Sequence, residues 1–140
     1  MDVRVDGCRL VRLTVKGDDR GSLVAIEGDE TVPFPIARAY YVYGTQPGVS
    51  RGFHAHRRLR QLAIAVAGRC DMFLDDGTAQ QLVPLDDPSL GLMIGPMCWR
   101  EMRNFSPDCV LLVLASDHYD ESDYIRDHDA FLAAARGART

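Results

Sequence analysis

Two histidines stand close together in the stretch RGFHAHRRLRQ, which covers residues 51–61. A single residue separates His54 from His56, and side chains along a β-strand alternate between the two faces of a sheet. If this stretch is a strand, both imidazoles point to the same side. Such a pair can bind a metal ion, transfer protons or simply fill a wall of the fold.

The residues around this pair are spaced as in the first motif of the cupins. In metal-binding cupins a glutamate normally stands at the position of Gln61, and a second motif normally supplies one more histidine. The corresponding region here is PMCWREMRNF, with Glu101 about where that histidine is expected. No histidine occurs in residues 57–117, and His118 and His128 fall at or within an expected C-terminal helix.

This set of side chains favours proton transfer over metal binding. The neutral amide of Gln61 is a weaker ligand than a carboxylate. A site made of His54, His56 and Glu101 remains an alternative, because two histidines and one carboxylate bind iron in some enzymes. A purely structural pair is the other alternative. Imidazole, with an ordinary pKa near ~6.5, can act as both base and acid near neutrality, so we expect proton transfer without a bound metal.

The pattern of the chain predicts an all-β fold. Its 140 residues are enough for one domain with a proper core, so residues 1–140 are expected to form a single domain. Short apolar and β-branched runs separated by turn residues, with no alternation of strands and helices, are typical of a barrel or sandwich. The expected strands cover residues 10–15, 22–28, 37–45, 51–56, 61–68, 70–74, 79–85, 90–96, 98–105 and 109–116, with a hairpin at Asp75, Asp76 and Gly77.

Residues 116–137 are expected to form a C-terminal helix. Acidic residues crowd its start, where the helix dipole favours them. An apolar stripe at roughly helical spacing is expected to pack on the barrel or on a partner chain, and Gly137 is expected to end the helix. The stripe consists of Tyr124, Ile125, Phe131 and Leu132. The charged residues of this segment are expected to form a solvated face.

Composition argues against several classes of protein. The formal net charge is −4, and no basic stripe is visible, so we expect no nucleic-acid binding. The apolar runs are far shorter than the ~20 residues of a membrane span, and the N-terminus lacks the apolar core of a signal peptide. We therefore expect a cytoplasmic protein whose cysteines are reduced: Cys8, Cys70, Cys98 and Cys109, none of them in a CxxC pair.

Five stretches resemble the cupin-type sugar-nucleotide 3,4-ketoisomerases, which act on dTDP-4-keto-6-deoxyglucose. They are DDRGSLVAIE, PFPIARAYYVY, RGFHAHRRLRQ, GLMIGPMCWREM and CVLLVLASDHYDESDYIRDHDAF, within about residues 18–131. The resemblance implies a cupin jelly-roll barrel with a short C-terminal helix. It also implies a homodimer that exchanges N-terminal strands, so residues 1 to about 25 would lie in the partner's sheet, which would protect an exposed edge.

The resemblance further implies the reaction. The C4 ketone of the bound hexose acidifies the proton on C3, a base removes that proton, and protonation at C4 leaves the ketone at C3. The hydrogen shift is internal, so no redox cofactor is expected, and polar groups can stabilise the enediolate without a metal. The product would feed an aminotransferase that makes a 3-amino-3,6-dideoxy sugar for surface glycans or glycosylated metabolites.

Individual residues can be given roles that fit this chemistry. His54 is expected to be the base at C3, with His56 as proton shuttle or orienting partner. Tyr40 resembles the family's active-site tyrosine and would donate to a sugar oxygen. Arg51 would offset negative charge or hold phosphate. Because the chain has no glycine-rich phosphate motif, arginine must bind the nucleotide, and Arg20 is the leading candidate, expected to reach across a subunit boundary.

The remaining candidates are less specific. Gln61 and Glu101 are expected to hydrogen-bond the histidines or the sugar, and Trp99 is either a wall of the site or a packing residue. Arg20 and Arg100 occupy positions at which family members differ, so we expect them to influence which face of C4 receives the proton. The rival hypotheses are a dTDP-keto-sugar epimerase, a metal-dependent cupin oxygenase and a non-catalytic sugar-binding cupin.

Overall fold

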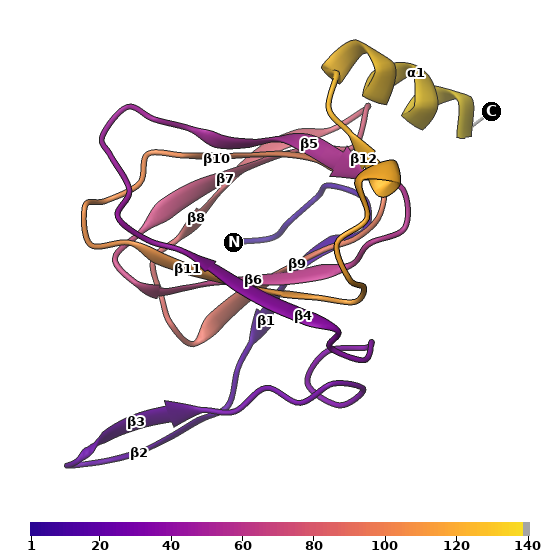
Figure 1. Ribbon diagram of the computed structural model, residues 1–140. Helices are drawn as coiled ribbons and strands as arrows, with labels where there is room; N and C mark the ends of the chain where they lie inside the picture. Colours follow the sequence, from indigo (N-terminus) through magenta and orange to yellow (C-terminus); the bar gives the residue numbers. More distant parts are fainter. Residues whose placement is uncertain (139–140) are drawn as a thin grey trace.

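The computed structural model describes residues 1–138, which fold into two five-stranded sheets that face each other (Figure 1). The first sheet has the order β1 (Cys8–Arg12), β9 (Leu90–Ile94), β6 (Gln61–Ala67), β11 (Val110–Ala115) and β4 (Arg38–Val42). The second has the order β12 (Tyr124–Ile125), β5 (Arg51–His56), β10 (Trp99–Arg103), β7 (Cys70–Asp75) and β8 (Gln80–Leu85). All pairings in both sheets are antiparallel.

The prediction of an all-β cupin-like barrel with a short C-terminal helix is confirmed. The hairpin expected at residues 75–77 joins β7 to β8, and the backbone N–H of Asp76 donates to the carbonyl of Ala79. Boundaries were wrong near the N-terminus, because the strand expected over residues 10–15 is divided between the end of β1 and the start of β2 (Val15–Asp18), and the strand expected over residues 22–28 ends at Val24.

Strand β6 shows how the sequence builds a cavity inside the barrel. Gln61 and Ala63 point into the barrel, while the alternating Leu62 and Ile64 point outward and are buried beneath the segment that carries Phe34. A strand buried on both faces reads as a nearly continuous apolar run, as this one does. The small inward alanines leave space near the polar end of Gln61.

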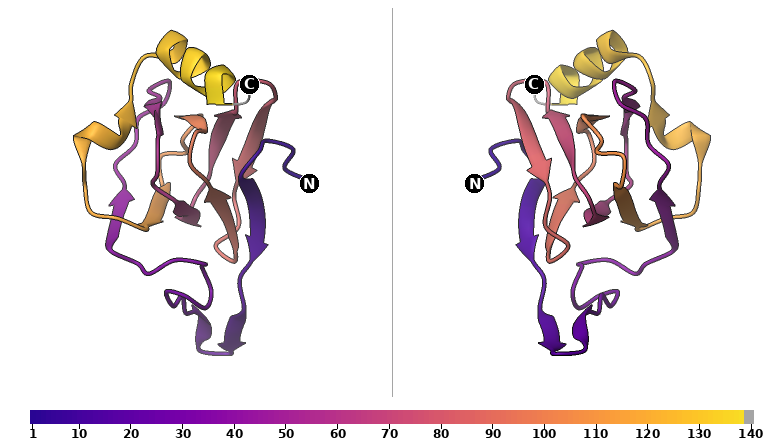
Figure 2. Two further views of the ribbon diagram at one scale, coloured as in Figure 1. Left: turned by 90° about the vertical axis from the view of Figure 1, so that its right-hand side faces the viewer. Right: turned by 90° about the vertical axis from the view of Figure 1, so that its left-hand side faces the viewer.

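A two-stranded hairpin made by β2 and β3 (Gly21–Val24) projects from the barrel at the end opposite to α1 (His128–Ala138), as Figure 2 shows. Its side chains are almost all exposed, including the apolar Val15 and Leu23. The hairpin makes no ladder with either sheet among the described residues. Arg20 lies in its turn.

The C-terminal segment was only partly predicted. The helix expected over residues 116–137 begins instead at His128, after a short 3₁₀ turn (Glu121–Asp123) and strand β12, which pairs with β5. Asp and Ser side chains compete with helical hydrogen bonds by capping nearby backbone groups. Here the carboxylate of Asp120 accepts from the backbone N–H of Ser122. Gly137 lies inside α1 rather than at its end.

Helix α1 packs on the barrel, which is one of the two arrangements expected for it, the other being packing on a partner chain. Phe131 and Ala135 are buried against Ala55, Trp99 and Ile125 on the outer face of the second sheet. Tyr124 is not part of this apolar stripe, because it turns toward the two histidines.

Within residues 1–138 no helix has the length and apolar content that crossing a membrane requires. All four cysteines are free and buried.

Candidate functional site

The two histidines of β5 meet inside the barrel, which confirms that their spacing puts them on one face. The ring centroids of His54 and His56 are 4.9 Å apart, and the rings meet edge to face. The ring of Tyr124 lies over both, at 5.0 Å from His54 and 4.3 Å from His56. His56 is 1% exposed, whereas His54 is only partly buried and lines an open cavity.

An irregularity in β5 brings a further residue to this face. The pairing with β10 shifts between Arg100, opposite His54, and Glu101, opposite Gly52, so that Phe53 is an extra residue. Phe53 has φ of 57°, an unusual value for a bulky side chain. Such a β-bulge changes the alternation of the strand. Arg51, three residues before His54, therefore lines the same cavity as that histidine.

The floor of the site is a chain of hydrogen bonds between three strands. The guanidinium of Arg100, only 2% exposed, donates through Nη1 to Oε1 of Gln61 and through Nε and Nη2 to the carbonyl of Cys98, at 3.2 and 3.1 Å. Gln61 Nε2 donates to the Tyr40 hydroxyl at 3.1 Å. These three side chains and His54 surround the innermost part of the barrel cavity.

The mouth of the site is rich in arginine. A cavity of about 330 Å³ opens beside Tyr40, His54 and Met102 and is also lined by Arg38, Arg51 and Arg126. Arg38 has a buried Nε without a hydrogen-bond partner, and its guanidinium lies 5.2 Å from the Tyr40 ring. Arg126 is held by a bidentate ion pair with Glu121, at 2.7 and 2.8 Å. Guanidinium groups in this arrangement suit a phosphate ligand.

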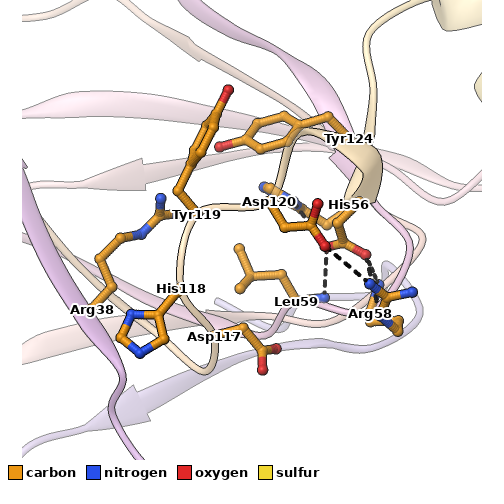
Figure 3. Close-up of a pocket in the computed structure, with 10 residues that line it drawn as sticks. Arg38, His56, Arg58, Leu59, Asp117, His118, Tyr119, Asp120 and Tyr124 are labelled. Atoms are coloured by element: carbon orange, nitrogen blue, oxygen red, sulfur yellow. Dashed lines mark hydrogen bonds and ion pairs between the residues drawn. The ribbon is translucent and has the colours of Figure 1, made fainter.

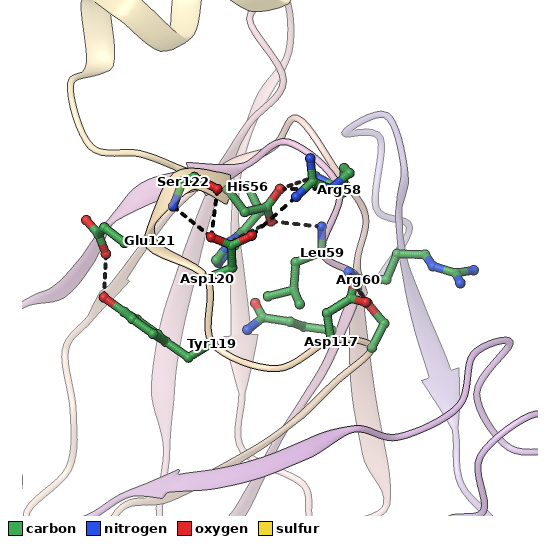
Figure 4. Close-up of polar contacts among 12 residues, drawn as sticks. His56, Arg58, Leu59, Arg60, Asp117, Tyr119, Asp120, Glu121 and Ser122 are labelled. Carbon is green, nitrogen blue, oxygen red and sulfur yellow. Dashed lines mark hydrogen bonds and ion pairs between the residues drawn. The ribbon is translucent and has the colours of Figure 1, made fainter.

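A second cavity, of about 410 Å³, shares part of its lining with the first, and Figure 3 shows the residues around it. Arg38 and Tyr124 line both cavities, and the second also contains His56, Arg58 and His118. Figure 4 shows Asp120 between Ser122 and Arg58. Its carboxylate accepts hydrogen bonds from both residues and so connects the loop beside this cavity to the end of β5.

The carboxylate of Asp123 joins this loop to the histidines. It is 6% exposed and accepts from the backbone N–H groups of Arg58 and Leu59, at 2.9 and 3.2 Å. Its Oδ2 lies 3.3 Å from Nδ1 of His56, although the geometry falls short of a hydrogen bond. Asp123 is thus placed to orient His56.

Both histidines are neutral near pH 7. Burial, and next the positive charge of Arg100, lower the pKa of His54 from 6.5 to about 4. The same two causes, with His54 as a further contributor, lower the pKa of His56 to about 2. Burial raises the pKa of the Tyr40 phenol above its usual value of 10. The site therefore offers a neutral imidazole as proton acceptor and a protonated phenol as donor.

This arrangement predicts an unusual pH dependence. The base must be neutral, so kcat/KM should stay level from pH 7 down to about 5 and fall as pH passes through about 4, the pKa of His54. A solvated histidine would lose activity near ~6.5 instead. Because the folded pKa is below the unfolded one, the free energy of unfolding should also decline below ~6.5, so circular dichroism at each pH must show that the protein is folded. An acid limb near 6.5 in folded protein would contradict the assignment.

The residues present do not suit a metal ion. Gln61, at the position of the usual carboxylate ligand, turns its oxygen to Arg100, and that guanidinium repels cations from the space beside His54. Within residues 1–138 no group of three or more histidine, cysteine or acidic side chains could hold a metal.

Two of the predicted site residues lie elsewhere. Trp99 and Glu101 point to the outer face of β10, beneath α1, where the Trp99 indole donates to Glu101 Oε2 at 2.9 Å and packs against His128. Glu101 also accepts from Arg103. The expectation that Glu101 hydrogen-bonds the histidines was wrong, because alternation along β10 makes Arg100 the inward residue. Trp99 is a packing residue.

Arg20 is also remote from the histidines within one chain. It lies in the turn of the β2–β3 hairpin, and its side chain is 86% exposed and pairs with Asp18 at 2.6 Å. Arg20 lines neither of the two cavities beside the histidines. A role at the site would require a second subunit.

Several site residues were missed from the sequence. Arg38 precedes Tyr40 by two positions, so strand alternation alone could have placed it on the same face. The expected helix would place Asp123 and Arg126 on a solvated face and Tyr124 in its apolar stripe, and both interpretations are wrong. The signal that could have identified these three residues is the resemblance of the SDHYDESDYIR stretch to the family. A long matching stretch that is not a core strand indicates a functional role.

Comparison with known proteins agrees with this geometry. The family model described as "FdtA: WxcM-like, C-terminal" matches residues 6–136. A TDP-4-oxo-6-deoxy-alpha-D-glucose-3,4-oxoisomerase from Aneurinibacillus thermoaerophilus is 53% identical over 114 residues, or 81% of this chain and 82% of that protein.

Two crystal structures are similar over nearly the whole chain. A 3,4-ketoisomerase from Helicobacter canadensis is 46% identical with a TM-score of 0.91, over 95% of this chain and 99% of that one. A histidine-to-asparagine variant of the 3,4-ketoisomerase QdtA from Thermoanaerobacterium thermosaccharolyticum, in complex with TDP-4-keto-6-deoxyglucose, is 39% identical with a TM-score of 0.93, over 95% and 96% of the two chains.

Proposed function

This chain belongs to the family described as FdtA, WxcM-like C-terminal, and from that premise we propose that it is a dTDP-sugar 3,4-ketoisomerase. It converts dTDP-4-keto-6-deoxyglucose to a dTDP-3-keto-6-deoxyhexose for the biosynthesis of 3-amino-3,6-dideoxy sugars. The observation that carries the proposal is a neutral His54 that faces an arginine-lined cavity beside Tyr40 and the buried Arg100.

The first step is removal of the proton from C3. The neutral imidazole of His54 accepts it, and the electron pair of the broken C–H bond moves toward the C4 carbonyl, so that negative charge develops on the C4 oxygen. Preorganised donors in a buried site stabilise such charge strongly. Tyr40 and the positive charge of Arg100 supply this stabilisation beside His54.

The second step returns a proton to C4. The proton of the C3 hydroxyl passes to the C4 oxygen, so that the C3 ketone and the C4 hydroxyl form, and carbon C4 takes up a proton from a protonated histidine. His56 lies 4.9 Å from His54 between ring centroids, close enough to share or relay that proton. Asp123 beside His56 Nδ1 stabilises the imidazolium while it exists. No electrons leave the substrate, so no redox cofactor takes part.

The nucleotide requires contacts with its diphosphate. Arg38 and Arg51 at the mouth of the cavity fit that role, since Arg38 has an unpartnered buried Nε and Arg51 is exposed. In our proposal the protein is a cytoplasmic homodimer that exchanges the β2–β3 hairpin, whereas β1 stays paired with β9 in its own chain and is not exchanged as expected for residues 1 to about 25. The exposed apolar residues of the projecting β2–β3 hairpin support this exchange, which would bring Arg20 toward the partner's site.

The experiment is incubation of the purified protein with dTDP-4-keto-6-deoxyglucose, followed by proton NMR. We expect the substrate signals to be replaced by those of a 3-keto product, whose coupling constants also give the configuration at C4. An unchanged substrate in the presence of folded protein would contradict the proposed function. Calorimetry with dTDP would then separate a binding module from an enzyme for a different sugar.

A further inference from the structure

We propose that Gln61 is a positioning residue: held by Arg100, its amide forces the Tyr40 hydroxyl to accept on one side and to donate its proton into the cavity. The inference rests on the proposed function and deepens it. It assigns Gln61 neither to the substrate nor to a metal but to the orientation of a catalytic donor.

Arg100 fixes which way the Gln61 amide points. A guanidinium has five N–H donors and no acceptor, so the atom that faces Arg100 Nη1 must be the amide oxygen, Oε1. Arg100 cannot turn away, because Nε and Nη2 both donate to the carbonyl of Cys98 at 3.2 and 3.1 Å. Gln61 is 3% exposed and Arg100 is 2% exposed, so water does not compete for these groups.

The orientation of the amide then determines the role of Tyr40. With Oε1 on Arg100, the group that faces Tyr40 is the Nε2 amino group, 3.1 Å from the hydroxyl, and an amide nitrogen donates but does not accept. The phenol oxygen must therefore accept this hydrogen bond. Among residues 1–138, Tyr40 makes no second hydrogen bond, so its own proton is free to point into the cavity that it shares with His54.

A glutamate at position 61 would reverse this arrangement. One carboxylate oxygen would pair with Arg100, and the other would accept the proton of Tyr40. The phenol would then turn its donor away from the substrate, and the charge of Arg100 would be neutralised. Metal-binding cupins use glutamate at this position as a ligand. Here an amide is needed instead, because it leaves the Tyr40 proton and the charge of Arg100 available to the substrate.

The test compares Gln61→Glu with Gln61→Met, each in the wild-type and in the Tyr40→Phe background. Gln61→Glu should lower kcat by ~10²-fold, the scale for loss of one oxyanion donor, while the Kd for dTDP changes by less than about threefold. Gln61→Met, which cannot capture the phenol proton, should lose no more than about tenfold. In the Tyr40→Phe background the effect of Gln61→Glu should shrink by about tenfold or more, since there is no proton to capture.

A merely structural role gives a different pattern. If Gln61→Glu and Gln61→Met lose equal activity, or if Gln61→Glu has the same effect with and without the Tyr40 hydroxyl, the inference is overturned. Thermal melts of all variants show which of them fold.

A second readout does not depend on turnover. Rapid alkaline pH jumps, read by tyrosinate absorbance with the Tyr40→Phe signal subtracted, follow the ionisation of Tyr40 alone. Gln61→Glu should raise the pKa of Tyr40 above that of the wild type, because the carboxylate accepts the phenol proton and adds negative charge. An unchanged pKa overturns the inference. Failure of the wild type to convert the sugar nucleotide would instead overturn the proposed function alone.

Discussion

Replacing His54 by asparagine is expected to lower kcat by at least ~10²-fold, the usual contribution of a positioned general base. Asparagine is polar and fits the space, but it has no site that can accept the C3 proton. His54 lines the arginine-rich cavity beside Tyr40, whereas His56 is almost fully buried and lines the second cavity. Steady-state kinetics with dTDP-4-keto-6-deoxyglucose measures the loss.

The matched control is His56→Asn in the same assay. Both variants should bind dTDP like the wild type and keep their thermal stability within a few degrees, because within residues 1–138 no hydrogen bond or ion pair joins either histidine to Arg38 or Arg51. If His54→Asn keeps more than about half of the activity while His56→Asn is inactive, the roles of base and helper are reversed. If both remain active, the histidines are structural.

The second large effect concerns the charge at the floor of the site. Arg100→Met should lower kcat by ~10²–10³-fold, as expected for loss of a group that stabilises the developing oxyanion. Methionine of similar length can fill a buried site without an unpaired charge, so folding is expected to survive. The same substitution should also raise the pKa of His54 from about 4 toward its ordinary value, because Arg100 is the largest charge that lowers it. The acid limb of kcat/KM should therefore move to higher pH.

Arg103→Met is the matched control for this prediction. Arg103 lies on the same strand but on its outer face, where it pairs with Glu101 at 2.7 Å. Its replacement should leave kcat and the acid limb nearly unchanged. If Arg100→Met and Arg103→Met behave alike in folded protein, Arg100 has no electrostatic role in the reaction.

Simple alternation predicted part of this site and failed where the backbone is irregular. His54 and His56 share a face because nothing interrupts the strand between them. Arg51 joins them only because Phe53 is bulged, with φ of 57°, and no residue preference signals a bulge at a phenylalanine. Its assignment to the site came from family resemblance and not from strand periodicity.

A shift of one residue explains the error on β10. The second cupin motif suggested Glu101 as the inward residue, yet the register with β5 puts Arg100 opposite His54. Both faces of β10 carry charged residues, with Glu101 and Arg103 on the outer face and Arg100 on the inner one. Polarity therefore did not reveal which face is inside.

The C-terminal segment shows a different limit. Its acidic start and apolar spacing suit a helix, and a helix does follow from His128. Residues before it are instead held by tertiary contacts, namely the pairing of Tyr124 with His56 in β12 and β5 and the hydrogen bonds of Asp123 to the loop after β5. Such long-range contacts override local preference and cannot be read from the segment alone.

The most direct test of the central claim, that neutral histidines move a proton between C3 and C4, is the reaction in deuterated water followed by NMR. An imidazole that holds the C3 proton exchanges it with solvent when the site is open, so the 3-keto product should carry deuterium at C4 in a fraction of turnovers, and C5 should keep its hydrogen. A sample without protein controls for spontaneous exchange next to the ketone. Deuterium at C5 with inversion at that carbon would identify an epimerase and contradict the claim, as would a 4-keto sugar nucleotide that stays unchanged after long incubation with folded protein.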